Sequence, residues 1–116
     1  MQIDVKLVQK RSLEEFADEH NLVMEVVERE HHGNIYGNGY HVSRFYAHFK
    51  KVDIKEGFCL IGSTGNGETQ EEAIEDYMRE ISNKLIVFDA FSETDRKELW
   101  VPNLISVYKP ATRNPV

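Results

Sequence analysis

Hydrophobic and polar residues follow a helical period between Thr69 and Leu85. Six apolar residues recur there at intervals of three and four, as on one stripe of a helix: Ala73, Ile74, Tyr77, Met78, Ile81 and Leu85. Thr69 and Glu72 have the spacing of a capping box, which marks a helix start. Three glycines between positions 62 and 67 favour a sharp reversal just before it. The pattern predicts a strand, a glycine turn and an amphipathic helix of about four turns.

The same spacing occurs earlier in the chain. Ser12 and Glu15 form a second capping-box pattern, and Asn21 is a residue type that ends helices in a left-handed conformation. A narrow apolar face lies between them, made of Leu13, Phe16 and Ala17. These signals predict a short helix over Ser12–His20.

Alternation with a period of two, and short apolar runs, predict strands over the remaining segments. The expected strands are Gln2–Gln9, Leu22–Arg29, Ser43–Val52, Phe58–Ile61, Ile86–Phe91 and Lys97–Val101. The glycine-bearing segment 31–42 has no period and predicts a loop, and Pro102 ends the last strand.

This order, β-α-β-β-β-α-β-β, predicts one α+β domain over residues 1–108, with an antiparallel sheet and both helices on one face. Residues 109–116 contain two prolines and no apolar pattern, so we expect a disordered tail. The expected core consists of Leu13, Phe16, Phe45, Ala47, Phe49, Ile61, Ile74, Tyr77, Met78, Ile81 and Leu85.

Composition limits which ligands and which cellular location we expect. A net charge of -6 and a pI near 5.3 argue against attraction to phosphate backbones or anionic lipid as the main driving force. The single cysteine, Cys59, excludes an internal disulfide, and its apolar surroundings predict a buried thiol. No run approaches the roughly 18 apolar residues of a membrane span. We therefore expect a soluble cytoplasmic protein that does not bind membranes.

The segments RFYAHF (44–49), GNGET (65–69) and QEEAIEDY (70–77) lie in a helix, three strands, helix order that resembles the double-stranded-RNA-binding domain fold. The resemblance implies a fold, but the first turn of the last helix carries Gln70, Glu71 and Glu72 where binders of duplex RNA have lysines. GETQEEAIED (67–76) is also similar to the helix start of HicB-type antitoxins. The short acidic chain further resembles accessory proteins of bacteriophages and prophages.

Charge is distributed unevenly between the predicted faces. Acidic residues dominate both helices, whereas Arg44, Tyr46, His48 and Lys50 alternate outward on the predicted strand over 43–52. Such a face has the composition of a protein interface, and it could also stack single-stranded bases. The alternative is that the charged helix faces are merely solvated.

Other candidates are weaker. The glycine turn could bind an anion, but Glu68 would repel it, and His31, His32 and His41 could ligate a metal but lack a completing ligand. No catalytic or cofactor motif is present, so we expect no enzyme activity and no cofactor. The sequence predicts a non-enzymatic binding protein that acts through protein contact, with a nucleic-acid-binding module as the alternative.

The strands at the chain ends predict self-association. Ile3–Leu7 and Lys97–Val101 lie towards the two ends of the chain, so we expect at least one of them at a sheet edge, which recruits a further strand unless it is protected. Within the second strand, either Trp100 or the pair Leu99 and Val101 must be covered by something other than the main core. The loop over 31–42 or a second copy of the chain could cover it, and we expect a homodimer.

Overall fold

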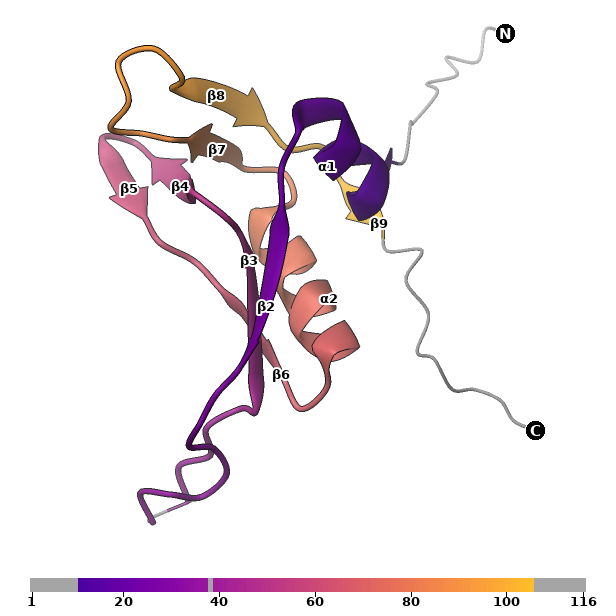
Figure 1. Ribbon diagram of the computed structural model, residues 1–116, viewed down its shortest axis with the longest axis vertical. Helices are drawn as coiled ribbons and strands as arrows, with labels where there is room; N and C mark the ends of the chain where they lie inside the picture. The colour runs from indigo at the N-terminus through magenta and orange to yellow at the C-terminus, as the bar shows by residue number, and fades with distance from the viewer. Residues whose placement is uncertain (1–10, 38, 106–116) are drawn as a thin grey trace, which may run out of the picture.

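The computed structural model describes residues 11–37 and 39–105 and has the predicted α+β class (Figure 1). Its two helices are α1 (Leu13–His20) and α2 (Gln70–Ile81). Its strands are β1 (Arg11–Ser12), β2 (Met24–Glu28), β3 (Phe45–Phe49), β4 (Val52–Glu56), β5 (Cys59–Ile61), β6 (Gly65–Gly67), β7 (Leu85–Phe88), β8 (Lys97–Trp100) and β9 (Leu104–Ile105). The predicted strand Gln2–Gln9 and the predicted tail 109–116 lie outside the described residues.

The strands form two antiparallel sheets and one short parallel pair. One sheet has the order β2-β3-β6, the other has the order β5-β4-β7-β8, and β1 pairs with β9. Both helices lie on the same face of the β2-β3-β6 sheet (Figure 1). Leu13 of α1, Phe49 of β3 and Ile74 of α2 line one groove there. β7 and β8 form the predicted terminal hairpin.

A bend at Lys50 and Lys51 divides the predicted strand Ser43–Val52 into β3 and β4, which enter different sheets. Lys51 has a φ of 62°, a conformation that neither a strand nor a helix continues through. Its carbonyl accepts a hydrogen bond of 2.8 Å from the N–H of Asp89, which has a φ of 50°. Five strands therefore lie between the helices instead of three, so the arrangement does not confirm the order expected from the double-stranded-RNA-binding domain.

The glycines before α2 serve packing more than chain reversal. Gly65 and Gly67 lie in β6, which pairs with β3, and neither has a positive φ. A Cβ on Gly65 would stand 2.1 Å from the backbone nitrogen of Tyr77, and one on Gly67 would stand 2.5 Å from that of Ala73. The prediction of a plain turn was wrong here, because these residues allow α2 to lie directly against a strand.

Both predicted helices begin at their capping residues. The Ser12–Glu15 capping box is complete, and Thr69 accepts a hydrogen bond of 3.1 Å from the N–H of Glu72. However, α2 ends at Ile81, so the prediction that its stripe extends to Leu85 was wrong. Asn83 has a φ of 61° and its N–H donates to the carbonyl of Val101, which turns the chain into β7.

The two sheets and both helices share one hydrophobic core. Its buried residues are Leu13, Phe16, Leu22, Ala47, Phe49, Val52, Ile54, Ala73, Tyr77, Ile81, Ile86, Val101 and Leu104. Burial of the Tyr77 hydroxyl raises its pKa to about 12.

The predictions of a buried Ile61 and a buried Cys59 were wrong: Ile61 is 42% exposed and Cys59 is exposed, because β5 is an edge strand. The helices of the described segments are α1 and α2, and neither has the length and apolar composition that crossing a membrane requires.

Candidate interaction surface

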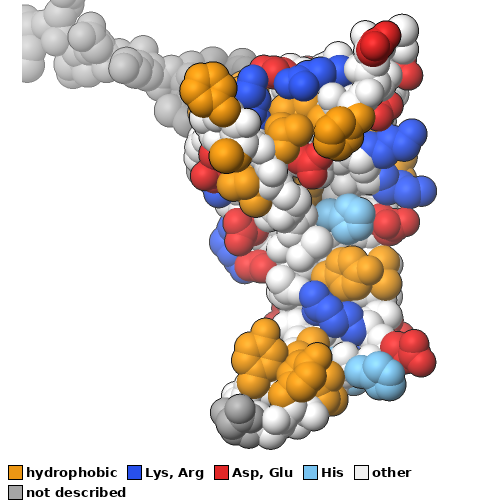
Figure 2. All heavy atoms as spheres, turned by 90° about the vertical axis from the view of Figure 1, so that its left-hand side faces the viewer, with side chains coloured by type: hydrophobic (Ala, Val, Ile, Leu, Met, Phe, Trp, Pro, Cys, Tyr) orange, Lys and Arg blue, Asp and Glu red, His pale blue; other side chains and the backbone are white. Residues whose placement is uncertain are grey.

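The face of the β2-β3-β6 sheet that points away from the helices carries the predicted polar and aromatic residues. Cross-strand partners share a face, and the rows Val27–Tyr46–Asn66 and Glu25–His48 alternate with rows that pack on the core. Figure 2 shows this side of the molecule, on which hydrophobic, basic and histidine side chains alternate between the two ends. We call the outward side chains of these two rows, together with Arg29 and Lys50, the Tyr46 surface.

Tyr46 lies at the centre of a stacked group. Its ring and that of His48 are parallel within 7°, with centroids 6.2 Å apart. The guanidinium carbon of Arg29 lies 4.8 Å from the centroid of the Tyr46 ring. Arg29 is fixed there by hydrogen bonds to the side-chain oxygen of Asn66 (2.6 Å) and the carbonyl of Ser43 (2.8 Å). The stack is therefore ordered before any partner binds, which lowers the entropy cost of binding.

Carboxylates lie close to the basic side chains that the sequence predicted for this surface. Glu25 lies 3.3 Å from His48 and 3.9 Å from Lys50, measured between side-chain oxygen and nitrogen atoms. Arg44 donates to Glu28 at 2.6 Å, and its guanidinium lies over the ring of Phe45. Phe45 packs against the core, so Arg44 extends towards the helix side of the sheet and the prediction that it lies beside Tyr46 was wrong.

The loop over 31–42 adds two more tyrosines at one end of the Tyr46 surface. The rings of Tyr36 and Tyr40 are exposed, with centroids 5.8 Å apart, and both line a pocket of about 500 Å³ with Arg29 and Asn66. His41 is held by Glu68, with 2.9 Å between its Nε2 and the carboxylate, and this hydrogen bond lowers the pKa of Glu68. In the described segments, no three histidine, cysteine or acidic side chains gather as a metal site would require.

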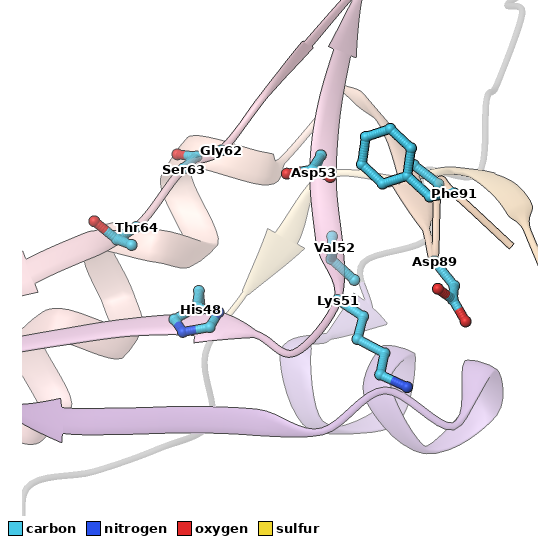
Figure 3. Close-up of a pocket in the computed structure, with 10 residues that line it drawn as sticks. His48, Lys51, Val52, Asp53, Gly62, Ser63, Thr64, Asp89 and Phe91 are labelled. Carbon is cyan, nitrogen blue, oxygen red and sulfur yellow. The ribbon is translucent and has the colours of Figure 1, made fainter.

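A second pocket lies at the other end, where β3 and β4 diverge (Figure 3). It has a volume of about 420 Å³, and His48 of the Tyr46 surface forms part of its wall. Asp53, Thr64 and Asp89 add polar groups, and the exposed Phe91 lies across from His48 (Figure 3). The Tyr46 surface therefore continues into a hollow at each end.

The other predicted sites are separated from this surface. Trp100 is 63% exposed but lies in β8, the edge strand of the other sheet, while Leu99 packs on the core and Val101 is buried. The glycine segment offers little to an anion, because the N–H of Asn66 donates to the carboxylate of Asp76 at 2.8 Å. The structure thus unites Tyr46, His48 and Lys50.

Sequence patterns did not reveal Arg29, Tyr36 and Tyr40. Arg29 follows the last residue of β2 and pairs through its backbone with Arg44, so only the strand register shows that it reaches Tyr46. The two tyrosines lie in a segment without a period, where spacing carries no information about position.

Comparison of the chain with protein-family models, with curated proteins and with solved structures gave no match.

Proposed function

We propose that this chain is a non-enzymatic binding protein of a bacterium or its phage, which acts in the cytoplasm by contacting another protein through the Tyr46 surface. The preordered stack of Arg29, Tyr46 and His48 is the observation that carries this proposal. Tyrosine and arginine are, with tryptophan, the residue types enriched among the side chains that dominate binding at protein interfaces, and a fixed side chain loses little freedom on binding.

The charge pattern favours a protein over a nucleic acid. A strand of nucleic acid needs cations that are free to neutralise phosphates. On this surface Lys50 and His48 share Glu25. Arg44 lies off this surface and is bound to Glu28. A protein partner can instead use the apolar rings and the hydrogen-bonding groups around them.

Capture from the native host, with nuclease treatment, tests the proposal. The wild-type chain should retain a specific protein that Tyr46→Ala loses and that Trp100→Ala, an exposed aromatic residue on the other sheet, keeps. Nuclease should not change the result. Capture that is unaffected by Tyr46→Ala would refute the role of this surface.

A direct titration with a single-stranded oligonucleotide addresses the alternative function. Fluorescence anisotropy should show no binding at about 0.15 M salt. Tight binding that weakens steeply with salt and depends on Tyr46 would establish nucleic-acid binding instead, since aromatic stacking and phosphate contacts act together in such sites.

We also propose, as the edge strands predict, that the chain forms a homodimer. The four-stranded sheet has two edges, β5 and β8, at which a second copy can add a strand. This association is independent of the Tyr46 surface and needs its own measurement.

A further inference from the structure

The edge formed by β5 is apolar and exposed. One side of β5 pairs with β4, in the register that runs from Ile54↔Ile61 to Glu56↔Cys59. The other side has no partner strand in the described part of the chain. All three residues of β5 are exposed, and so is Phe58, which precedes them in the hairpin turn. Unpaired backbone groups flanked by apolar side chains favour pairing with another strand.

The other edge strands of the two antiparallel sheets, β2, β6 and β8, each have a feature that discourages pairing with a further strand. β2 has Glu25 within it, and β8 has Lys97 within it and Pro102 just after it. On β6, the N–H of Asn66 already donates to the carboxylate of Asp76. Such protection leaves β5 as the edge best suited to strand addition, whereas sequence order alone points to Ile3–Leu7 or Lys97–Val101.

We propose that β5 pairs antiparallel with β5 of a second copy about a twofold axis at Leu60, which joins the two four-stranded sheets into one sheet of eight strands. This inference rests on the homodimer proposed above and specifies its interface. In this register Leu60 faces Leu60 of the partner subunit, and Cys59 faces Ile61 of the partner subunit. No charged residue faces another across the axis.

The residues around β5 fit this register. Phe58 comes opposite Gly62 of the partner subunit, and an added Cβ on Gly62 would meet its nearest atom only at 3.8 Å, so the space above it is open. An aromatic ring that covers a glycine on the neighbouring strand is a favourable cross-strand pair.

The charges of the adjacent strand do not oppose the contact. Lys55 lies 3.0 Å from Glu98, and Glu56 lies 3.9 Å from Lys84, in both cases within one protomer. Two paired copies therefore bring no unpaired like charges together. Because β5 has three residues, the interface is small and the dimer should depend strongly on protein concentration.

Sedimentation equilibrium over a concentration series tests the proposal with Leu60→Lys and a matched control, Trp100→Lys, on the opposite edge. Leu60→Lys sets two ammonium groups against each other at the axis and should raise the dimer dissociation constant at least about tenfold. Trp100→Lys should leave it unchanged. Circular dichroism should show both variants folded, since both side chains are exposed.

The outcomes separate the two proposals. A wild type that stays monomeric up to about 1 mM overturns the homodimer and this interface together. A wild-type dimer that Trp100→Lys dissociates and Leu60→Lys does not overturns the β5 interface and leaves the homodimer standing at β8.

Disulfide trapping tests the register without relying on a charged variant. Residues directly opposite in antiparallel strands have Cα atoms about 4.5 to 5.5 Å apart, a spacing that a disulfide can bridge. Leu60→Cys in a Cys59→Ser background should form a covalent dimer under mild oxidation faster than the wild type, whose Cys59 faces Ile61 of the partner subunit. Faster crosslinking of the wild type would overturn the register.

Discussion

Replacement of Gly65 by alanine tests the central packing contact of the fold. β6 lies so close to α2 that a Cβ on Gly65 would stand 2.1 Å from the backbone nitrogen of Tyr77 and 2.2 Å from the carbonyl oxygen of Ala73. These distances are more than about 1 Å shorter than ordinary van der Waals contacts, and backbone atoms cannot rotate away. The helix or the strand must move.

The expected cost follows from what such a movement disturbs. Overpacking a core typically costs about 1 to 3 kcal/mol, and more when the backbone must shift. Displacement of α2 would also loosen Ala73, Tyr77 and Ile81, which are almost completely buried. We expect Gly65→Ala to lower the free energy of unfolding by at least about 3 kcal/mol, a large part of the roughly 5 to 15 kcal/mol typical of a domain.

Urea denaturation followed by circular dichroism measures this change, and Gly62→Ala is the control. Gly62 lacks a positive φ, and an added Cβ would have its nearest atom at 3.8 Å, so its substitution should change the stability of the dilute, monomeric protein by less than about 0.5 kcal/mol. Equal denaturant slopes would show that the unfolded states are comparable. If Gly65→Ala is as stable as Gly62→Ala, then α2 does not pack on β6 as described.

Three further predictions concern stability. Ile81→Asp should unfold the domain, because it buries an unpaired charge at a fully buried position, whereas Glu80→Asp on the exposed side should keep the wild-type melting temperature. Ser12→Ala removes one half of a complete capping box and should cost about 1 kcal/mol in urea denaturation; no loss would mean that solvent replaces the cap. Burial, with the nearby charges of Lys97 and Arg11, lowers the pKa of His20, so the unfolded state binds more protons and stability should fall as the pH drops below about 6.5. His20→Gln should flatten that slope between about pH 7.5 and pH 5.5, and an unchanged slope would refute this assignment.

The sequence by itself determined where the helices begin and which faces they bury. Ser12 and Thr69 bond to backbone N–H groups three residues ahead, and these contacts are local, so their spacing is visible in the chain. The apolar stripe of α2 up to Ile81 and the outward position of Tyr46 and His48 follow from periods of 3.6 and 2 residues. Such features depend on residues that are close in sequence.

Tertiary contacts decided where the elements end, where the chain bends and which strands lie at sheet edges, none of which the periods of 3.6 and 2 residues encode. The end of α2 depends on Asn83 reaching the carbonyl of Val101, and the bend between β3 and β4 coincides with the bond from Asp89 to Lys51. The exposure of Ile61 follows from β5 lying at a sheet edge, a position set by strand order. Arg29 reaches Tyr46 only through the register of β2 and β3. Gly65 matters because Tyr77 of α2, twelve residues further along the chain, packs directly against it. Each of these outcomes depends on atoms distant in sequence, which is why local patterns could not predict them.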